Sequence, residues 1–316
     1  MKDFGDDSVS SSQWSNNLFA ILLTGQLLSI PCYLFLFYHL LRDKLLWRNL
    51  QNHSIVLLLI YNFLQMMIGL SMTLNFYRVG HQYPLNVSLC FLHGYVDYGI
   101  WYGALHIMFW ISIERHILIF YSNFLRTARQ RVLFHYIPLG FISSYAPILY
   151  FYLIVLYPCQ RFYNGFFLFC GVVCYSHVIP QWFGWFEPLV NYALPIVFIG
   201  VFSWTLIIRV ILQKRRLQQA MNWRRQRKMI IQLASVSIIY LAFNLPYVIV
   251  TVASWLEVFL FDGYTVAVYI GAFAYMPAIV MPYANLVALS PLKSKLAKLL
   301  FWKPKQQRTV APSART

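Results

Sequence analysis

The sequence predicts an all-α membrane protein: a bundle of seven transmembrane helices followed by a short amphipathic helix. Of its 316 residues, 60% are hydrophobic and only 11% are charged, and the mean hydropathy is +0.59. Soluble domains have about a quarter of their residues charged, so these values exclude a disordered chain and argue against a soluble enzyme. Seven apolar stretches each reach the roughly 20 residues that a helix needs to cross a bilayer core.

The predicted spans follow one another with short polar connections, except for one long segment between the fourth and the fifth. They cover residues 18–41, 55–76, 91–120, 132–157, 188–212, 229–256 and 264–289. Cysteine, glycine, proline and arginine interrupt residues 159–186, which we interpret as a long structured loop, with an eighth span as the alternative. Residues 1–17 are expected to form an extracellular tail, residues 290–303 an amphipathic helix on the membrane surface, and residues 304–316 a cytoplasmic tail.

Basic residues predict the orientation of the bundle. The side that holds the N-terminus carries three of them, Lys2, Arg78 and Arg161, and the opposite side carries the remaining 25 − 3 = 22. Since cytoplasmic loops are enriched in Lys and Arg, we expect a multi-pass plasma-membrane protein with its N-terminus outside. The net charge of +16 then faces anionic inner-leaflet lipids, and no nucleic-acid binding is expected. The sequon at Asn86 lies outside and is a candidate glycosylation site, whereas the one at Asn52 lies inside and is a chance match.

Four of the five cysteines fall on the predicted outer side. Cys90 lies at the start of the third span, and Cys159, Cys170 and Cys174 lie in the long loop. Because that side is oxidising, we expect Cys90 to pair with Cys174 or with Cys170, and a second bridge to close within the loop. Reduced thiols in an apolar loop are the alternative. No cysteine or histidine spacing of a zinc site is present, so neither a metal nor a cofactor is expected.

Several short motifs occur in a fixed order along the spans. They are Asn62 in the second span, Ser112-Ile113-Glu114-Arg115-His116 at the inner end of the third, Pro195 in the fifth, Phe243-Asn244-Leu245-Pro246 in the sixth, Met281-Pro282-Tyr283-Ala284-Asn285 in the seventh, and Ser290-Pro291-Leu292 after it. Together with the topology, this series resembles the rhodopsin-like (class A) G-protein-coupled receptors over residues 18–303. The spacing between Cys90 and Arg115 is also similar to that family's.

The resemblance implies a receptor that binds a ligand outside and activates a heterotrimeric G protein inside. It implies that Glu114 holds Arg115 at rest, and that Pro246 and Pro282 are hinges that let the inner half of the sixth helix swing outward. Some positions depart from the family pattern. Asn62 replaces the usual Asp, so sodium regulation of the usual kind is not expected, and Asn244 replaces the usual Trp.

Asp97 and Arg115 lie on one face of the third span. They are 18 residues apart, which is five helical turns and about 27 Å along the axis. Because charged residues within a membrane normally face the bundle interior or water, this face is expected to point inward. Asp97 then lies near the outer mouth and Arg115 near the inner one.

The resemblance places a ligand site around Asp97. At this position amine receptors and some peptide receptors hold a carboxylate that binds a ligand cation, and Tyr275 matches a family tyrosine that donates to it. Trp101 and Tyr247 would add cation–π contacts, and Glu187 would supply a second acid. The alternative is that Asp97 only satisfies local groups such as His93, Tyr98 and Tyr102.

The favoured function is therefore a G-protein-coupled receptor for an extracellular amine or peptide, with the basic segment 209–228 as a docking surface for the G protein. A transporter or channel is the main alternative, and a scaffold that does not signal is another. A light receptor is not expected, because Tyr275 stands where the resemblance would require a lysine for retinal. An enzyme is not expected either, because His39, His106 and His135 are scattered over three spans.

Overall fold

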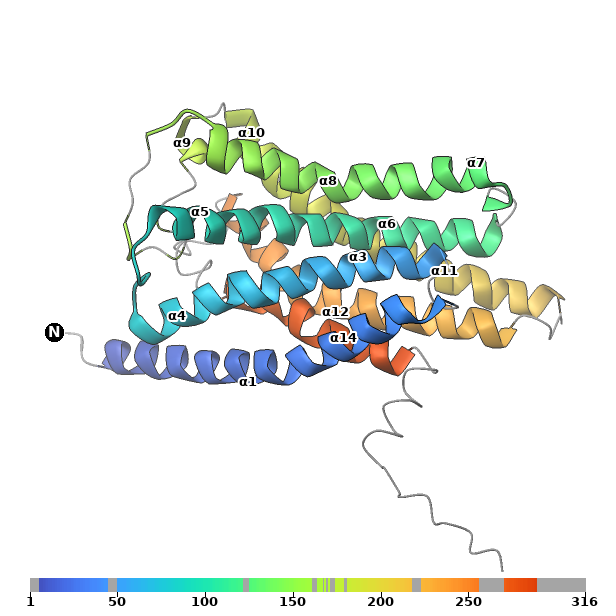
Figure 1. The fold of residues 1–316 in the computed structure, drawn as a ribbon, viewed down its shortest axis with the longest axis horizontal. Helices are drawn as coiled ribbons and strands as arrows, with labels where there is room; N and C mark the ends of the chain where they lie inside the picture. The colour runs from blue at the N-terminus through green and yellow to red at the C-terminus, as the bar shows by residue number, and fades with distance from the viewer. Residues whose placement is uncertain are drawn as a thin grey trace, which may run out of the picture.

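The structure, a computed structural model, describes residues 6–44, 50–121, 125–160, 164–166, 168, 170, 174–178, 181–217, 223–255 and 270–288. Within these ranges the regular structure is entirely helical, which confirms the predicted all-α bundle. Six helices are long and apolar enough to cross a membrane, and a shorter apolar helix covers Gly271–Val287. The helices run along the long axis of the molecule (Figure 1).

The first three spans are built from consecutive helical segments. They are α1 (Asp6–Arg42), then α3 (Leu50–Leu64) with a π-helical stretch Gln65–Leu70 and α4 (Ser71–Val79), and then α5 (Val87–Tyr95) with a π-helical stretch Val96–Ile100 and α6 (Trp101–Phe120). A π-helical turn inserts an extra residue and locally changes which side chains face a neighbour. Here the two stretches lie opposite each other and shape the outer part of the bundle.

The remaining spans follow the same plan. They are α7 (Ala128–Arg131), the π-helical stretch Val132–Tyr136, α8 (Ile137–Phe151) and the π-helical stretch Tyr152–Leu156; then α10 (Gln181–Phe186), the π-helical stretch Glu187–Ala193 and α11 (Leu194–Leu217); then α12 (Trp223–Trp255); and last a 3₁₀ turn Gly271–Tyr275 that leads into α14 (Met276–Ala288). A short helix, α9 (Tyr175–Val178), precedes α10.

The prediction of a long structured loop over residues 159–186 is wrong at its C-terminal end, which is part of the fifth span. The fifth span begins at Gln181 rather than at Pro188. Phe183 is buried and packs on Tyr175 and Phe186, with ring centroids 6.2 and 5.6 Å away, so burial of aromatic surface favours an earlier helix start. Pro188 is accommodated in the wider π-helical turn, where the clash of a proline ring with the preceding turn is relieved.

The third span lies at the centre of the bundle, where α6 packs against α3, α8 and α11. Its predicted inward stripe is buried, because Ala104, Met108, Ser112 and Arg115 are each at most 1% exposed. The other packed pairs include α12 with α14 and α1 with α14, so the seventh helix closes the bundle between the first and the sixth.

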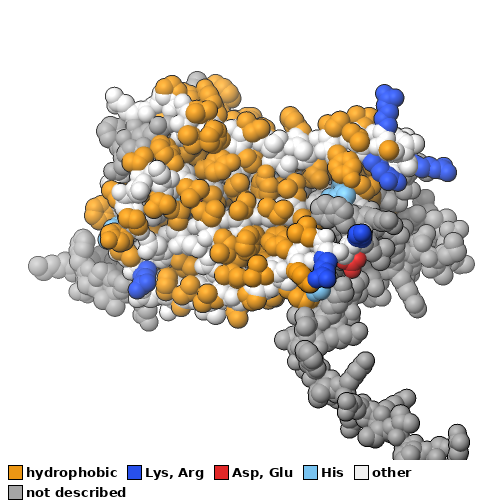
Figure 2. Space-filling view, in the orientation of Figure 1, with side chains coloured by type: hydrophobic (Ala, Val, Ile, Leu, Met, Phe, Trp, Pro, Cys, Tyr) orange, Lys and Arg blue, Asp and Glu red, His pale blue; other side chains and the backbone are white. Residues whose placement is uncertain are grey.

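Hydrophobic side chains cover the middle of the face in Figure 2. Basic side chains gather mainly at one end of it, where α1 ends and α7 begins, and this end carries Arg42, Lys44, Arg126, Arg129 and Arg131. The apolar middle fits a hydrocarbon core, and the basic end is the one that the charge distribution predicts to be cytoplasmic. The predicted surface helix 290–303, the tail 304–316 and the side chains of 213–232 lie outside the described residues.

Candidate functional site

Asp97 lies in the π-helical stretch Val96–Ile100 of the third span and is only 7% exposed. Its Oδ1 atom approaches Gly69, which belongs to the facing π-helical stretch of the second span. A Cβ atom on Gly69 would lie 2.4 Å from this oxygen. A side chain at position 69 would therefore collide with the carboxylate, and the glycine is what allows the two helices to bury it here.

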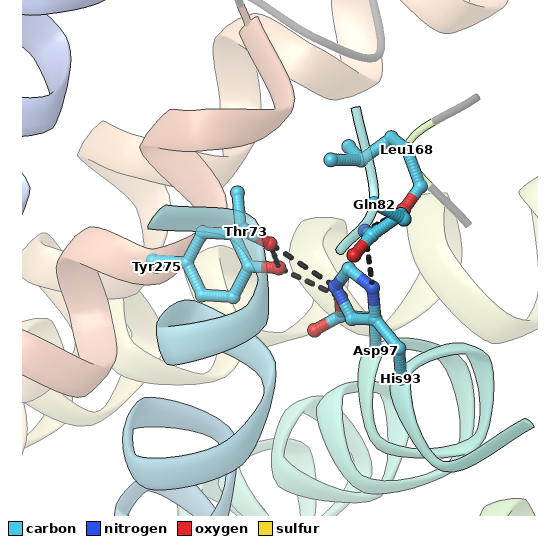
Figure 3. Close-up of polar contacts among 6 residues, drawn as sticks. All are labelled: Thr73, Gln82, His93, Asp97, Leu168 and Tyr275. Carbon is cyan, nitrogen blue, oxygen red and sulfur yellow. Dashed lines mark hydrogen bonds and ion pairs between the residues drawn. The ribbon is translucent and has the colours of Figure 1, made fainter. Parts of the chain in front are cut away.

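The other carboxylate oxygen of Asp97 is held by two neighbours (Figure 3). Oδ2 accepts a 2.7 Å hydrogen bond from the Tyr275 hydroxyl, as the resemblance implied, and lies 2.9 Å from Nε2 of His93. Thr73 supports both partners, since its Oγ1 lies 2.8 Å from the Tyr275 hydroxyl and 3.1 Å from Nε2 of His93. Among the residues that the structure describes, Oδ1 has no hydrogen-bond partner although it is buried. The carboxylate thus keeps one acceptor without a donor from these residues.

Four of the five predicted ligand residues line one cavity of about 90 Å³. They are Asp97, Trp101, Tyr247 and Tyr275, and they share it with Gln65, Thr73, Tyr77, Tyr98, Tyr102, Leu168, Gly271, Ala272 and Ala274. Trp101 packs on Tyr102, Tyr192 and Tyr247 with ring centroids 4.9 to 6.2 Å away. An anionic group surrounded by aromatic faces is the environment that favours a cation.

Glu187, the fifth predicted ligand residue, does not line this cavity. Its Oε1 accepts hydrogen bonds of 3.0 Å from the hydroxyl groups of Tyr150 and Tyr175. Burial, together with the charge of Glu187, raises the pKa of Tyr175 well above its usual value, so this phenol keeps its proton and remains a donor. The structure gives Glu187 a role in joining the fourth and fifth spans to α9.

The extracellular loop contributes to the cavity through its cysteines. Cys90 is bonded to Cys170, and Cys159 to Cys174, so the predicted alternative of Cys90 with Cys174 is wrong. The first bridge ties the top of the third span to the loop, and this places Leu168 in the cavity wall. Two loop cysteines lie within four residues of each other, which is why spacing alone did not separate the pairings.

At the opposite end of the bundle, the contacts of Glu114 and Arg115 differ from the expectation. Glu114 accepts a 2.6 Å hydrogen bond from Ser54 and forms an ion pair with His135, both of which are fully buried. Arg115 instead donates from Nη1 to Oε1 of Gln51 at 2.7 Å. The prediction that Glu114 holds Arg115 is therefore wrong for this structure, because the carboxylate is turned toward the second and fourth spans.

The structure also includes the two predicted hinge prolines, Asn62 of the second span and the predicted glycosylation site. Pro246 lies inside α12 and Pro282 inside α14, as predicted. Asn62 donates from Nδ2 to the Tyr240 hydroxyl at 2.9 Å, so a neutral pair between the second and sixth spans stands where the family usually has an acid. Asn86 is exposed and caps α5 through a 2.9 Å hydrogen bond from the Ser88 amide to its Oδ1.

Some important residues carried little signal in the sequence. His93 is four residues before Asp97, a spacing that puts both on one helix face, and it was considered only as a local partner. Thr73 and Gln82 reach the site from other segments, and Ser54 and Gln51 reach the inner cluster from the second span. Such contacts between distant segments cannot be read from spacing.

Comparison with known proteins identifies the fold. No protein-family model matches the chain, and no curated protein sequence matches it. Among solved structures, squid rhodopsin matches with a TM-score of 0.65 and 15% sequence identity, over 92% of this chain and 86% of the rhodopsin chain. The chain therefore has the fold of squid rhodopsin.

Proposed function

We propose that the chain is a rhodopsin-like G-protein-coupled receptor that binds a positively charged amine or peptide in the cavity around Asp97 and activates a heterotrimeric G protein. The observation that carries the proposal is the buried carboxylate of Asp97, which lines an aromatic cavity and has one oxygen without a hydrogen-bond donor among the described residues. A buried anion without a full set of partners is costly, and a ligand cation relieves that cost. The rhodopsin-type fold supports the same assignment.

The third helix supplies a physical path between the two sides. Asp97 contacts the second and seventh spans at one end through Gly69 and Tyr275, and Arg115 contacts the second span at the other end through Gln51. A ligand that changes the Asp97–Tyr275 contact changes how the seventh helix packs on the third. In this proposal the inner half of the sixth helix then swings outward about Pro246 and opens the cytoplasmic end to the G protein.

The proposal places the chain in the plasma membrane with its N-terminus outside. The basic end then faces anionic lipids and the G protein, whose contact surface is expected to be acidic. Light reception is not part of the proposal, because the position of the retinal lysine is taken by Tyr275, and its hydroxyl is bound to Asp97.

The test is G-protein activation in cells that express the chain together with a set of G-protein subtypes. The cells receive a panel of biogenic amines and short basic peptides, and surface expression is measured in parallel. We expect at least one cationic ligand to activate the wild-type chain and Arg115→Ala to abolish the response at equal surface expression. Uptake of the same compounds without G-protein activation would favour a transporter and would overturn the proposal.

A further inference from the structure

The hydrogen bonds of His93 determine its protonation state. Its ring is 0% exposed, and both nitrogen atoms have partners: Nε2 faces Asp97 and Thr73, and Nδ1 lies 3.0 Å from Nε2 of Gln82. A histidine nitrogen either donates or accepts, so each partner constrains one end of the ring. The partners are therefore enough to assign the tautomer.

The orientation of the Gln82 amide follows from the extracellular loop. Its Nε2 atom also contacts the backbone carbonyl oxygen of Leu168, which can only accept a hydrogen bond. The atom between Leu168 and His93 must therefore be the NH₂ group of the amide. Because that group donates to His93 as well, Nδ1 of His93 must accept and carries no proton (Figure 3).

The other ring nitrogen must carry the proton. Nε2 of His93 lies 2.9 Å from Oδ2 of Asp97, and two acceptors without a proton between them would repel each other at this distance. The Tyr275 hydroxyl already uses its own proton for Oδ2, so the Thr73 hydroxyl donates to the tyrosine oxygen and its own oxygen accepts from His93. These hydrogen bonds with Gln82, Asp97, Thr73 and Tyr275 are all satisfied with a neutral imidazole.

We propose that His93 is a positioning residue, held as the neutral Nε2–H tautomer by Gln82 and Leu168, so that Asp97 meets its ligand as an anion without a resident counter-ion. In the part of the chain that the structure describes, His93 is the only Lys, Arg or His side chain with a nitrogen atom within 4.0 Å of the Asp97 carboxylate. With a neutral His93 the pair keeps a net charge of −1. The site then accepts one positive charge from outside.

The extracellular loop thereby sets the charge of the ligand site. Leu168 lies two residues from Cys170, and the Cys90–Cys170 bridge fixes the loop to the same helix that carries His93 and Asp97. The consequence for ligand charge rests on the proposed receptor function, whereas the tautomer does not.

The test is ¹⁵N NMR of the purified full-length chain labelled with ¹⁵N-histidine, in lipid nanodiscs without ligand or G protein. The chain has eight histidines, so His93→Gln serves to assign the His93 signals by their disappearance. We expect one protonated nitrogen, Nε2, and one unprotonated nitrogen, Nδ1. Two protonated nitrogens, or a proton on Nδ1 alone, would overturn the proposal. Because the sample contains no G protein, a failure to signal in cells leaves this result unaffected.

A pair of variants tests the origin of the tautomer. Gln82→Glu replaces the donor with an acceptor, and we expect the second ring nitrogen of His93 to become protonated. Gln130→Glu is the matched control, since Gln130 caps α7 and a glutamate serves equally well in this capping box; it should leave the spectrum unchanged. An unchanged His93 spectrum in Gln82→Glu would overturn the role of Gln82. Where Gln82→Glu does not fold, the wild-type spectrum still decides the tautomer.

Discussion

The hydroxyl group of Tyr275 donates a 2.7 Å hydrogen bond to Asp97 and so joins the seventh helix to the third at the outer end of the bundle. Both residues are buried and both line the aromatic cavity. The other oxygen of the same carboxylate has no hydrogen-bond donor in the described part of the chain. A ligand cation that binds Asp97 would therefore change the hydrogen bond that holds the third and seventh helices together.

Tyr275→Phe removes one of the two donors to Oδ2 while keeping the ring. Loss of a hydrogen bond to a buried charge should lower the free energy of unfolding by about 1–3 kcal/mol, measured by thermal unfolding of the purified chain. The control is Tyr152→Phe, because Tyr152 is 50% exposed on the outside of the fourth span. Equal stability of the two variants would contradict the contact.

Gly69→Ala tests the close approach of Asp97 to the second span. The new methyl group would meet Oδ1 at 2.4 Å, so either the carboxylate or the helix must move. Overpacking of this kind costs about 1–3 kcal/mol and should also weaken activation by any cationic ligand. Gly140→Ala is the matched control, since no atom lies within 4 Å of its added Cβ. If both substitutions leave activation unchanged, Oδ1 is not positioned against Gly69.

The restraint on Arg115 can be tested without a ligand. Because Gln51 holds Arg115 and Glu114 is turned to His135, Gln51→Leu should raise basal G-protein activation, whereas Glu114→Gln should not. His135→Leu should instead destabilise the fold, because it removes a hydrogen-bond partner of the buried Glu114 carboxylate, which costs about 1–3 kcal/mol. A rise in basal signalling with Glu114→Gln alone would restore the expected Glu114–Arg115 restraint.

The two disulfides should contribute unequally to stability. Cys90–Cys170 closes a loop with a sequence separation of 80 residues and Cys159–Cys174 one of 15. In the chain-entropy model these bridges are worth about 4 and about 3 kcal/mol, so Cys90→Ser should lower the melting temperature more than Cys159→Ser. Peptide mapping by mass spectrometry under non-reducing conditions should recover these two pairs, and a Cys90–Cys174 peptide would contradict the structure.

Asn86 is predicted to carry an N-linked glycan on the outer face. Its Oδ1 caps α5, and a glycan attached to Nδ2 leaves that cap in place. Treatment with a glycosidase should reduce the mass of the wild-type chain but not that of Ser88→Ala, a variant that removes the sequon and keeps Asn86. Asn52 is 2% exposed, and Asn52→Gln should not change the glycan content.

The sequence was sufficient for the fold and for much of the outer site. Apolar length and the inward face of the third helix depend on local composition and spacing, which is why the spans and the burial of this face were predictable. The joint position of Asp97, Trp101, Tyr247 and Tyr275 was instead implied by the resemblance to the receptor family. The partners of these residues were not. Glu187 accepts hydrogen bonds from Tyr150 and Tyr175, and Glu114 contacts His135. A buried carboxylate needs hydrogen-bond donors, and which donors lie close to it depends on how the helices pack.

The start of the fifth helix also differs from the prediction, and packing between distant segments is again the reason. The sequence predicts that the fifth span begins at Pro188, because cysteine, glycine, proline and arginine interrupt the segment before it. In the structure the helix begins more than one turn before Pro188. Burial of Phe183 stabilises this earlier start, and the π-helical turn at Glu187 accommodates the proline. Aromatic burial in this case outweighs the local preference of proline.

The central claim is that Asp97 is the counter-ion of a positively charged ligand, and the most direct measurement is the potency of an activating amine on the wild-type chain and on Asp97→Asn at equal surface expression. Removing the carboxylate charge should cost about 2–5 kcal/mol of binding free energy, or about a 30- to 5,000-fold loss of potency. A neutral analogue of the same amine should activate both chains with equal, low potency. Unchanged potency of the amine on Asp97→Asn would contradict the claim.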